Sequence, residues 1–257
     1  MNYNFHTHTY HCHHASGTPE EYVLCAIKNG VTEMGFSDHF PFDFGDGTYN
    51  SARIPVSEVD DYLREIRALQ EKYRDKIKLH LGFEMEYYAE LFVQMLKKAK
   101  EYGAEYLLLG EHYARPENDP TSPHSSLPCT DGEHLRLYTD RVIEAIETGC
   151  FTYVAHPDVL NFIGSEALFR AEARRIALAS KKHGVPLEIN FLGIRDSRNY
   201  PSLPFWEEVA RVGSPVTFGF DAHSPNTAYD ENSLAVAKKM VKDLGLNYIG
   251  KPVFRRI

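Results

Sequence analysis

The stretch YNFHTHTYHCHH at residues 3–14 joins a short extended segment to five histidines and a cysteine. The chain has 13 histidines in 257 residues, so this segment is a local concentration of them. A tag would be an unbroken histidine run, whereas Thr, Tyr and Cys interrupt this one. Alternating residues 3–5 precede it and a helix start at 18–21 follows. We therefore expect a strand end here, with His6 and His8 on one face because they are two residues apart.

The composition is that of an ordinary globular protein, with 43% hydrophobic and 25% charged residues. A formal net charge of −8 argues against nucleic-acid or anionic-membrane partners. No apolar run approaches the ~20 residues of a membrane span, and no signal segment is evident. The four cysteines form no CxxC pair, which predicts reduced thiols in a cytoplasmic protein.

Apolar runs of strand length alternate with helix-period segments along the chain. The expected strands are residues 3–6, 33–37, 77–84, 106–110, 152–156, 186–190 and 216–220. The expected helices are residues 18–29, 57–73, 88–102, 133–148, 165–183, 203–212 and 231–244. Such repeats predict parallel strands joined by right-handed crossovers. An open doubly wound sheet would show the same alternation, but length and repeat number favour a closed or nearly closed (β/α) barrel over residues 1–257, one domain.

Two connections are longer than is usual between a strand and a helix. They are residues 40–56, after the second expected strand, and residues 113–132, after the fourth. Both lie on the face where barrels of this architecture carry their chemistry. We therefore expect these two loops to border a functional site.

Metal-ligand side chains stand at the ends of six of the seven expected strands. They are His6 and His8, His39, Glu84, His112, His156, and Asp221 with His223, in chain order. Because the carboxyl ends of barrel strands converge, we expect these side chains to meet. Imidazole and carboxylate suit divalent zinc, manganese or iron, and one ion uses only three or four such ligands. The sequence therefore predicts more than one metal ion.

At these positions the chain resembles the polymerase-and-histidinol-phosphatase (PHP) family. The resemblance rests on HTH (6–8), HCHHASG (11–17), SDHFP (37–41), GFEME (82–86), GEHY (110–113), AHPD (155–158) and DAHSP (221–225). The histidinol-phosphate phosphatase branch of the family is matched by His14, where many relatives carry aspartate. It is also matched by EINFLGIR at 188–195, a segment that places an arginine near the substrate phosphate.

The resemblance implies the PHP fold, a distorted (β/α)7 TIM-like barrel, with three divalent metal ions. The implied ligands are His6, His8, Glu84 and Asp221 for the first ion, Glu84, His112 and His156 for the second, and His14, His39 and His223 for the third. Glu84 would bridge the first two ions. The neighbouring His13 competes with His14 for its place, and motif register favours His14.

The implied reaction is hydrolysis of a small phosphomonoester, with L-histidinol phosphate of histidine biosynthesis as the expected substrate. Divalent ions would coordinate phosphoryl oxygens and lower the pKa of a bridging water toward ~7, giving hydroxide. Arg195 would bind the phosphate with a planar charged fork, and Arg53 is a lesser candidate. Either Asp221 or His223 would protonate the leaving alkoxide.

Three other interpretations stay open. An amidohydrolase-type barrel also begins with HxH, but it would usually want a lysine where this chain has Glu111 and His112. A PHP enzyme acting on another small phosphoester or a nucleotide fits the same motifs, and so does a noncatalytic metal-binding barrel. Among the remaining polar residues, we expect Asp38 to orient His39 or cap a turn, and His124 to be solvated.

Overall fold

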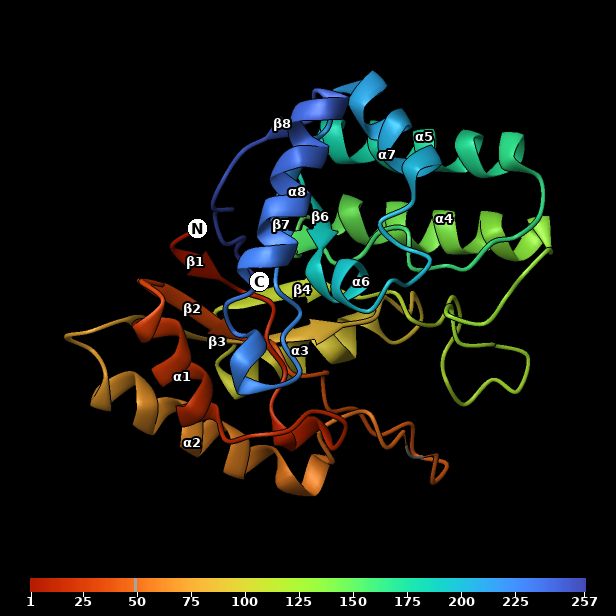
Figure 1. The fold of residues 1–257 in the computed structure, drawn as a ribbon. Helices are drawn as coiled ribbons and strands as arrows, with labels where there is room; N and C mark the ends of the chain where they lie inside the picture. The colour runs from red at the N-terminus through yellow and green to blue at the C-terminus, as the bar shows by residue number, and fades with distance from the viewer. Residues whose placement is uncertain (49) are drawn as a thin grey trace.

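The chain folds into a curled sheet of parallel strands wrapped by helices, drawn in Figure 1 from a computed structural model that describes residues 1–48 and 50–257. The strands follow one another in the sheet in sequence order, from β1 to β8. They are β1 Tyr3–Asn4, β2 Glu33–Phe36, β3 Lys78–Met85, β4 Tyr106–Leu109, β5 Tyr153–Val154, β6 Leu187–Asn190, β7 Pro215–Gly219 and β8 Asn247–Tyr248. All seven expected strands form, and β8 is a short addition that the sequence pattern did not predict.

The barrel closes where the chain segments beyond β1 and β7 meet. Thr7 forms a parallel bridge with Ala222. The amide of His8 donates to the carbonyl of Ala222 at 2.9 Å, and the amide of Ala222 donates to the carbonyl of His6 at 3.2 Å. At its amino end, β7 pairs with β8 instead of with β1. The predicted distorted barrel is therefore confirmed. It is distorted because the first and seventh strands meet only beyond their carboxyl ends.

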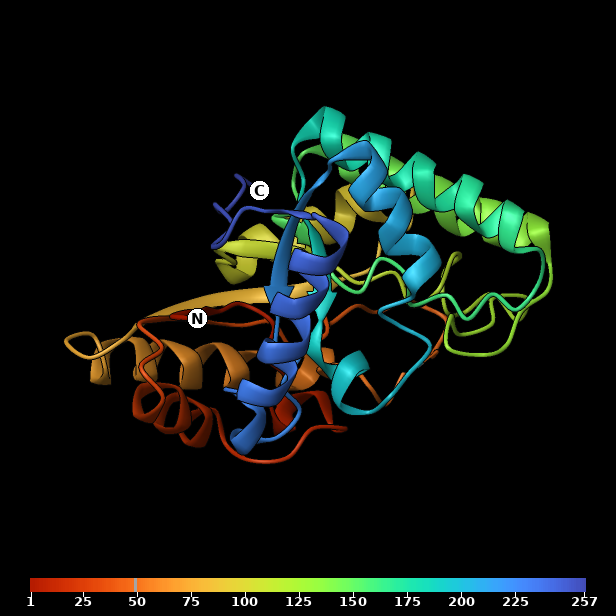
Figure 2. The ribbon, with the colours of Figure 1, turned by 45° about the horizontal axis from the view of Figure 1, so that its top comes forward.

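The helices cover the outside of the sheet. They are α1 Pro19–Lys28, α2 Val59–Lys72, α3 Phe92–Tyr102, α4 Gly132–Thr148, α5 Glu166–His183, α6 Phe191–Arg195, α7 Leu203–Val212 and α8 Glu231–Leu244, with 3₁₀ turns η1 Tyr10–Cys12, η2 Val56–Glu58 and η3 Pro225–Thr227. Figures 1 and 2 show α4, α5 and α7 together on one side and α1 with α2 on another. None of the helices in the described part of the chain is long and apolar enough to cross a membrane.

Helix boundaries follow local chemistry. At the start of α1, the Thr18 amide donates to the carboxylate of Glu21, and the sequence signal for this helix was correct. Gly149 ends α4 in the left-handed conformation that glycine adopts without cost. The helix expected over 88–102 begins only at Phe92. The short helix α6 was not predicted, because five residues carry too little periodicity to be recognised.

Aromatic rings fill the barrel at the amino ends of the strands. The hydroxyl of Tyr106 on β4 donates to the carbonyls of Phe5 and Phe36 at 2.9 and 3.1 Å. Phe254, from the C-terminal segment, stacks on the Tyr106 ring with 4.5 Å between centroids. Gly82 lies against the same ring, and a Cβ there would overlap it. This end of the barrel is a packed core, so a site can open only at the other end.

Candidate metal centre

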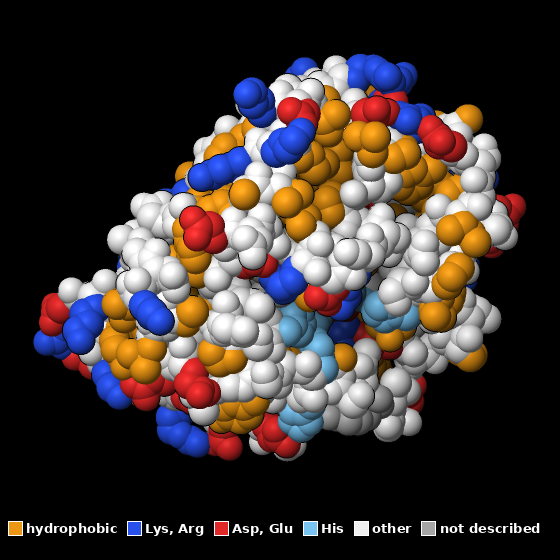
Figure 3. All heavy atoms as spheres, in the orientation of Figure 1, with side chains coloured by type: hydrophobic (Ala, Val, Ile, Leu, Met, Phe, Trp, Pro, Cys, Tyr) orange, Lys and Arg blue, Asp and Glu red, His pale blue; other side chains and the backbone are white. Residues whose placement is uncertain are grey.

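The carboxyl ends of the strands surround a cavity of about 660 Å³. Figure 3 shows histidine side chains gathered in and beside a hollow on this face. Eight of the nine predicted ligands line the cavity: His8, His14, His39, Glu84, His112, His156, Asp221 and His223. The ninth, His6, is fully buried against them. The convergence expected from the strand ends is therefore present in the structure.

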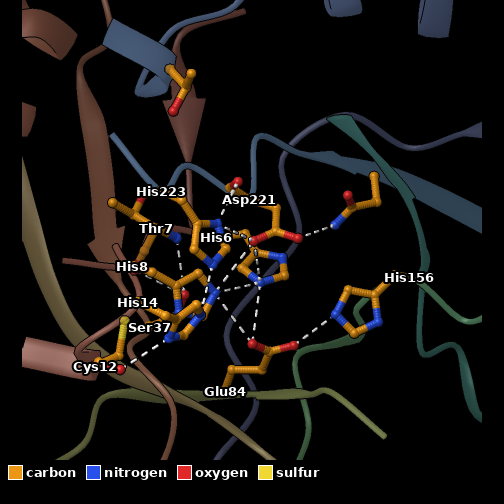
Figure 4. Close-up of polar contacts among 12 residues, drawn as sticks. His6, Thr7, His8, Cys12, His14, Ser37, Glu84, His156, Asp221 and His223 are labelled. Carbon is orange, nitrogen blue, oxygen red and sulfur yellow. Dashed lines mark hydrogen bonds and ion pairs between the residues drawn. The ribbon is translucent and has the colours of Figure 1, made fainter. Parts of the chain in front are cut away.

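The carboxylate of Glu84 contacts several imidazoles of this cluster, and Figure 4 shows it directed toward His6, His8 and His156. Its Oε2 is 3.2 Å from Nε2 of His8 and 3.3 Å from Nδ1 of His39. Its Oε1 is 2.8 Å from Nε2 of His156 and 3.7 Å from Nε2 of His112. Oε2 also lies 3.5 Å from Nε2 of His6. The two oxygens thus face different sets of imidazoles, which is the geometry of a carboxylate that can bridge two ions.

Asp221 faces Glu84 across the two imidazoles from the first strand (Figure 4). Its Oδ1 lies 3.5 Å from Nε2 of His6 and 3.4 Å from Nε2 of His8. The backbone of Asp221 has a φ of 45° and that of His156 a φ of 28°. Left-handed conformations of this kind are strained in residues other than glycine and occur where a site requires a fixed side-chain direction.

A second group of imidazoles opens toward the cavity. The Nε2 atoms of His14 and His223 are 3.0 Å apart. Ligand atoms of these two residues, His8 and His39 all lie within 4.8 Å of one another. His13 instead points to the surface, with its Nε2 3.0 Å from the carboxylate of Glu58. Of the two neighbours, the structure therefore brings His14 into the cluster and leaves His13 outside.

The donor atoms fit divalent metal ions. Within the set of predicted ligands, two buried carboxylate oxygens, Oε2 of Glu84 and Oδ1 of Asp221, have no hydrogen-bond partner among residues 1–48 and 50–257. A buried carboxylate oxygen left in this way is costly, and bonds to metal ions would satisfy both atoms. Nitrogen and oxygen donors suit zinc, manganese or iron. The number and identity of the ions stay predictions.

The carboxylate of Glu84 is charged, as a metal ligand must be. Burial acts to raise the pKa of Glu84, but the surrounding imidazoles, first His39 and then His112, hold it well below its usual range. Burial lowers the pKa of His39 well below its usual value and, with the charge of His8, lowers that of His223 to about 3. Burial also acts to lower the pKa of His6 and His8, but neighbouring carboxylates, first that of Asp221, hold it well above its usual value. A metal ion bound by His6 and His8 would therefore have to displace their protons.

Glu188 on β6 lies behind the cluster and was missed by the sequence analysis. Its Oε1 is 2.8 Å from Nδ1 of His6, and its Oε2 accepts from the amide of His156 at 2.9 Å. A carboxylate on the second nitrogen of a ligand histidine fixes its tautomer and ring direction. Gly219 leaves the space that the Glu188 carboxylate fills. The sequence signal was an acidic residue inside the apolar strand PLEIN.

Asp38 caps a turn. Its carboxylate accepts from the amide of Thr9 at 2.7 Å and from the hydroxyl of Thr9 at 3.0 Å. These bonds fix the chain just before η1, which carries the histidine segment back over the cavity. Of the two roles expected for Asp38, the structure shows the turn cap.

Arg195 does not line the cavity. Its guanidinium lies 3.0 Å from the carboxylate of Asp230 and donates to the backbone carbonyl of Asp221 at 3.1 Å. The short helix α6 directs it there, toward the N-terminus of α8. A phosphate-binding role for Arg195 stays a prediction, and in this structure the side chain supports the backbone of a predicted ligand.

Arg53 lines the cavity wall, but its donors are occupied. Nε donates to Glu117 at 2.7 Å, Nη1 donates to the carbonyl of Phe40 at 3.1 Å, and Nη2 pairs with both Glu86 and Glu117. Arg198 also lines the cavity and was missed by the sequence analysis. In the described part of the chain it donates to a carboxylate oxygen of Asp196 and to the hydroxyl of Tyr200, each at 3.4 Å. Arg198 is therefore the freer of the two cations at this wall.

The loop over 113–132 forms part of the cavity wall. Tyr113, His124 and Ser126 all face the cavity. The ring of His124 stacks on His112 with 5.7 Å between centroids, and burial lowers its pKa to about 4. The expectation that His124 is simply solvated was wrong, because the loop folds back over the strand ends.

Parallel strands that present imidazoles and carboxylates at their carboxyl ends define an α/β barrel with a metal centre. Comparison with known protein families identifies the kind of barrel. The PHP domain model matches residues 4–191, which is most of the chain. The chain therefore belongs to the PHP domain family.

Individual relatives agree with this family. A "Probable histidinol-phosphatase" of Deinococcus radiodurans is 27% identical over 250 residues, covering 93% of this chain and 92% of the relative. The "Histidinol-phosphatase" of Bacillus subtilis is 29% identical over 249 residues, covering 85% and 92%. The crystal structure of histidinol phosphate phosphatase from Lactococcus lactis, complexed with zinc, L-histidinol and phosphate, superposes with a TM-score of 0.72 at 20% identity, covering 96% of this chain and 95% of that one.

Proposed function

We propose that this chain is a metal-dependent phosphomonoesterase that hydrolyses L-histidinol phosphate to L-histidinol and phosphate, a step of histidine biosynthesis. The observation that carries the proposal is the convergence of nine donor residues, Glu84 among them, at one cavity. The names of the relatives support the substrate. We take residues 1–257 as a single PHP-type domain acting in the cytoplasm, a setting supported by the four free cysteines.

We assign three divalent ions to the centre. The ligand sets are those of the resemblance: His6, His8, Glu84 and Asp221; Glu84, His112 and His156; His14, His39 and His223. Bound ions would neutralise phosphoryl oxygens and lower the pKa of a water molecule at the site. The strained backbone of Asp221 and the carboxylate of Glu188 hold their donors in place for this purpose.

The chain's own side chains then bind and orient the substrate. We propose that Arg198 contacts the phosphate, because the guanidinium groups of Arg195 and Arg53 are engaged by carboxylates. An arginine fork can pair with two phosphate oxygens at once. Asp221 and His223 both line the cavity, and one of them protonates the leaving alkoxide.

A phosphate-release screen tests the function. The metal-loaded protein is assayed on L-histidinol phosphate, other small phosphomonoesters, nucleotides, amides and lactones, with chelator-treated protein as the control. We expect the highest kcat/KM for L-histidinol phosphate and loss of turnover in the control. Faster turnover of a nucleotide or of an amide would replace the proposal by one of the alternatives. Metal binding without any turnover would indicate a noncatalytic barrel.

Arginine variants test the phosphate contact. Arg198→Ala should lower kcat/KM by on the order of 10–10², the ~1.5–3 kcal/mol of a hydrogen bond to a charged group, because the side chain is 44% exposed, with metal content unchanged. Arg198→Lys should recover little of this loss, because an ammonium lacks the fork. Arg195→Ala is the comparison from the same segment, and its metal content is measured as well because Arg195 supports the backbone of Asp221. A large loss in Arg195→Ala with full metal content, alongside wild-type kinetics in Arg198→Ala, would return the role to Arg195.

A further inference from the structure

The two long loops over the cavity are joined at one buried carboxylate. Glu117, from the loop over 113–132, accepts from Nε of Arg53 at 2.7 Å and from the hydroxyl of Tyr88 at 3.1 Å. The amide of Asn50, from the loop over 40–56, donates to its other oxygen. The Glu117 side chain is only 4% exposed, so these contacts are shielded from solvent.

The same network continues to a predicted metal ligand. Nη2 of Arg53 lies 2.5 Å from Oε2 of Glu86, and both side chains are at most 5% exposed. Oε1 of Glu86 lies 3.0 Å from Nδ1 of His112, whose Nε2 faces Glu84. One continuous path therefore leads from a loop carboxylate through an arginine and a second carboxylate to a histidine of the metal cluster.

The energetics of burial make the members of this path depend on one another. A buried ion that loses its partner costs several kcal/mol, so neither carboxylate is stable there without the guanidinium. A carboxylate on the second nitrogen of a ligand histidine fixes the ring direction, and its loss typically weakens metal binding 10–100-fold. Substitution of Glu117 should therefore change the orientation of the His112 ring through Arg53 and Glu86.

We propose that Glu117 and Arg53 form a buried latch that holds Glu86 on Nδ1 of His112. In this role Arg53 is a positioning residue for the metal centre and does not bind substrate. The loop over 113–132 then completes the centre as well as walling the cavity. The inference rests on the proposed function only in taking His112 as a metal ligand.

Metal retention tests the latch without using turnover. The variants are Glu117→Gln and Arg53→Lys, which keep side-chain size and either remove a charge or remove the fork. The control is Asn118→Ala, because the amide of Asn118 also links the two loops, donating to Asp46 at 2.8 Å, but on the exposed surface. Ion release during dialysis against a chelator is followed by elemental analysis. Visible spectra of the cobalt-substituted proteins report the ligand geometry, and calorimetry measures the affinity for inorganic phosphate.

We expect both latch variants to release metal at least about 10-fold faster than wild type, with altered cobalt spectra. Phosphate affinity at saturating metal should stay within about threefold, a difference below ~0.7 kcal/mol. Asn118→Ala should behave as wild type. Wild-type metal release in Arg53→Lys, with a tenfold loss of phosphate affinity, would overturn the latch and make Arg53 a phosphate ligand. Equal metal loss in Asn118→Ala would also overturn it, because any loosening of the loops would then suffice.

Arg53→Lys carries the test alone if Glu117→Gln does not fold: faster metal release supports the latch, and wild-type release overturns it. The outcome is independent of the substrate. If L-histidinol phosphate is not hydrolysed but the latch variants lose metal, the proposed function fails and the latch stands.

Discussion

The two ends of the barrel are built from opposite kinds of side chain. At the amino ends of the strands, Tyr106, Phe5 and Phe254 form a dry aromatic plug whose central hydroxyl is satisfied by two carbonyls. At the carboxyl ends, Glu84 and Asp221 bury carboxylate oxygens that have no hydrogen-bond partner in the described part of the chain. The same sheet supports both ends.

The difference separates stability from function. Apolar burial at the plug stabilises the folded state by ~25 cal/mol per Å² removed from water. Buried carboxylates at the other end raise the free energy of the folded state unless positive charge lies close to them. We therefore expect substitutions in the plug to reduce the free energy of unfolding and leave metal binding intact. Substitutions in the cluster should instead reduce metal binding and turnover.

Tyr106→Ala should show the largest effect on stability. Removing a buried aromatic ring leaves a cavity and costs about 3–5 kcal/mol in the free energy of unfolding. Chemical denaturation measures this loss, and elemental analysis should find unchanged metal content. Tyr106→Phe is the control, because it keeps the ring and loses only the hydroxyl, whose one hydrogen is shared between two carbonyls, for about 1 kcal/mol. A loss below about 1 kcal/mol in Tyr106→Ala would show that the plug is dispensable.

Glu84→Gln should impair the metal cluster at the carboxyl ends of the strands. A bridging carboxylate serves two ions, so we expect at least a ~10²-fold fall in kcat, equivalent to about 2.7 kcal/mol, with partial metal loss. Glu101→Gln, on the exposed face of α3, controls for loss of a glutamate. Wild-type turnover would remove Glu84 from the centre.

Gly219→Ala tests the support behind the cluster. The added methyl group would overlap the carboxylate of Glu188, which is held on Nδ1 of His6. Overpacking of this kind costs about 1–3 kcal/mol, and we expect slower turnover with it. Shortening the carboxylate in the double variant Gly219→Ala, Glu188→Asp should restore part of the stability. If the single variant matches wild type in both denaturation and kinetics, this packing does not support the site.

The positions of the ligands were predictable because they depend on local pattern. His6 and His8 are two residues apart at the end of an extended segment, and parallel strands bring such ends together without any knowledge of side-chain contacts. Glu84 and His156 follow from the same rule. The regular strand pattern was therefore enough to predict that the cluster residues meet. This includes residues more than 200 positions apart in the sequence, such as His6 and Asp221.

The cavity walls were not predictable in this way. Arg53 and Glu117 are 64 residues apart in two loops without periodicity, so no pattern indicates that they pair. Arg195 was expected at the phosphate because its segment follows a strand end. In this structure helix α6 places its guanidinium 3.0 Å from Asp230, a contact that spacing did not indicate, and the phosphate role stays a prediction. The direction of each arginine side chain depends on which carboxylate lies nearest to it in space. That information is absent from residue spacing.

The smallest effect is expected at His13, and it tests the register of the opening histidine segment. His13 has a φ of 62°, so His13→Asn is the suitable change because asparagine tolerates the left-handed conformation. Its imidazole and the carboxylate of Glu58 are 39% and 48% exposed, and loss of such a surface pair costs at most about 1 kcal/mol. We expect unchanged metal content and kinetics in this variant. His14→Asn, one position along, should lose bound metal and turnover, because Nε2 of His14 faces His223 in the cluster. Metal loss in His13→Asn with full occupancy in His14→Asn would reverse the assignment of the third ion.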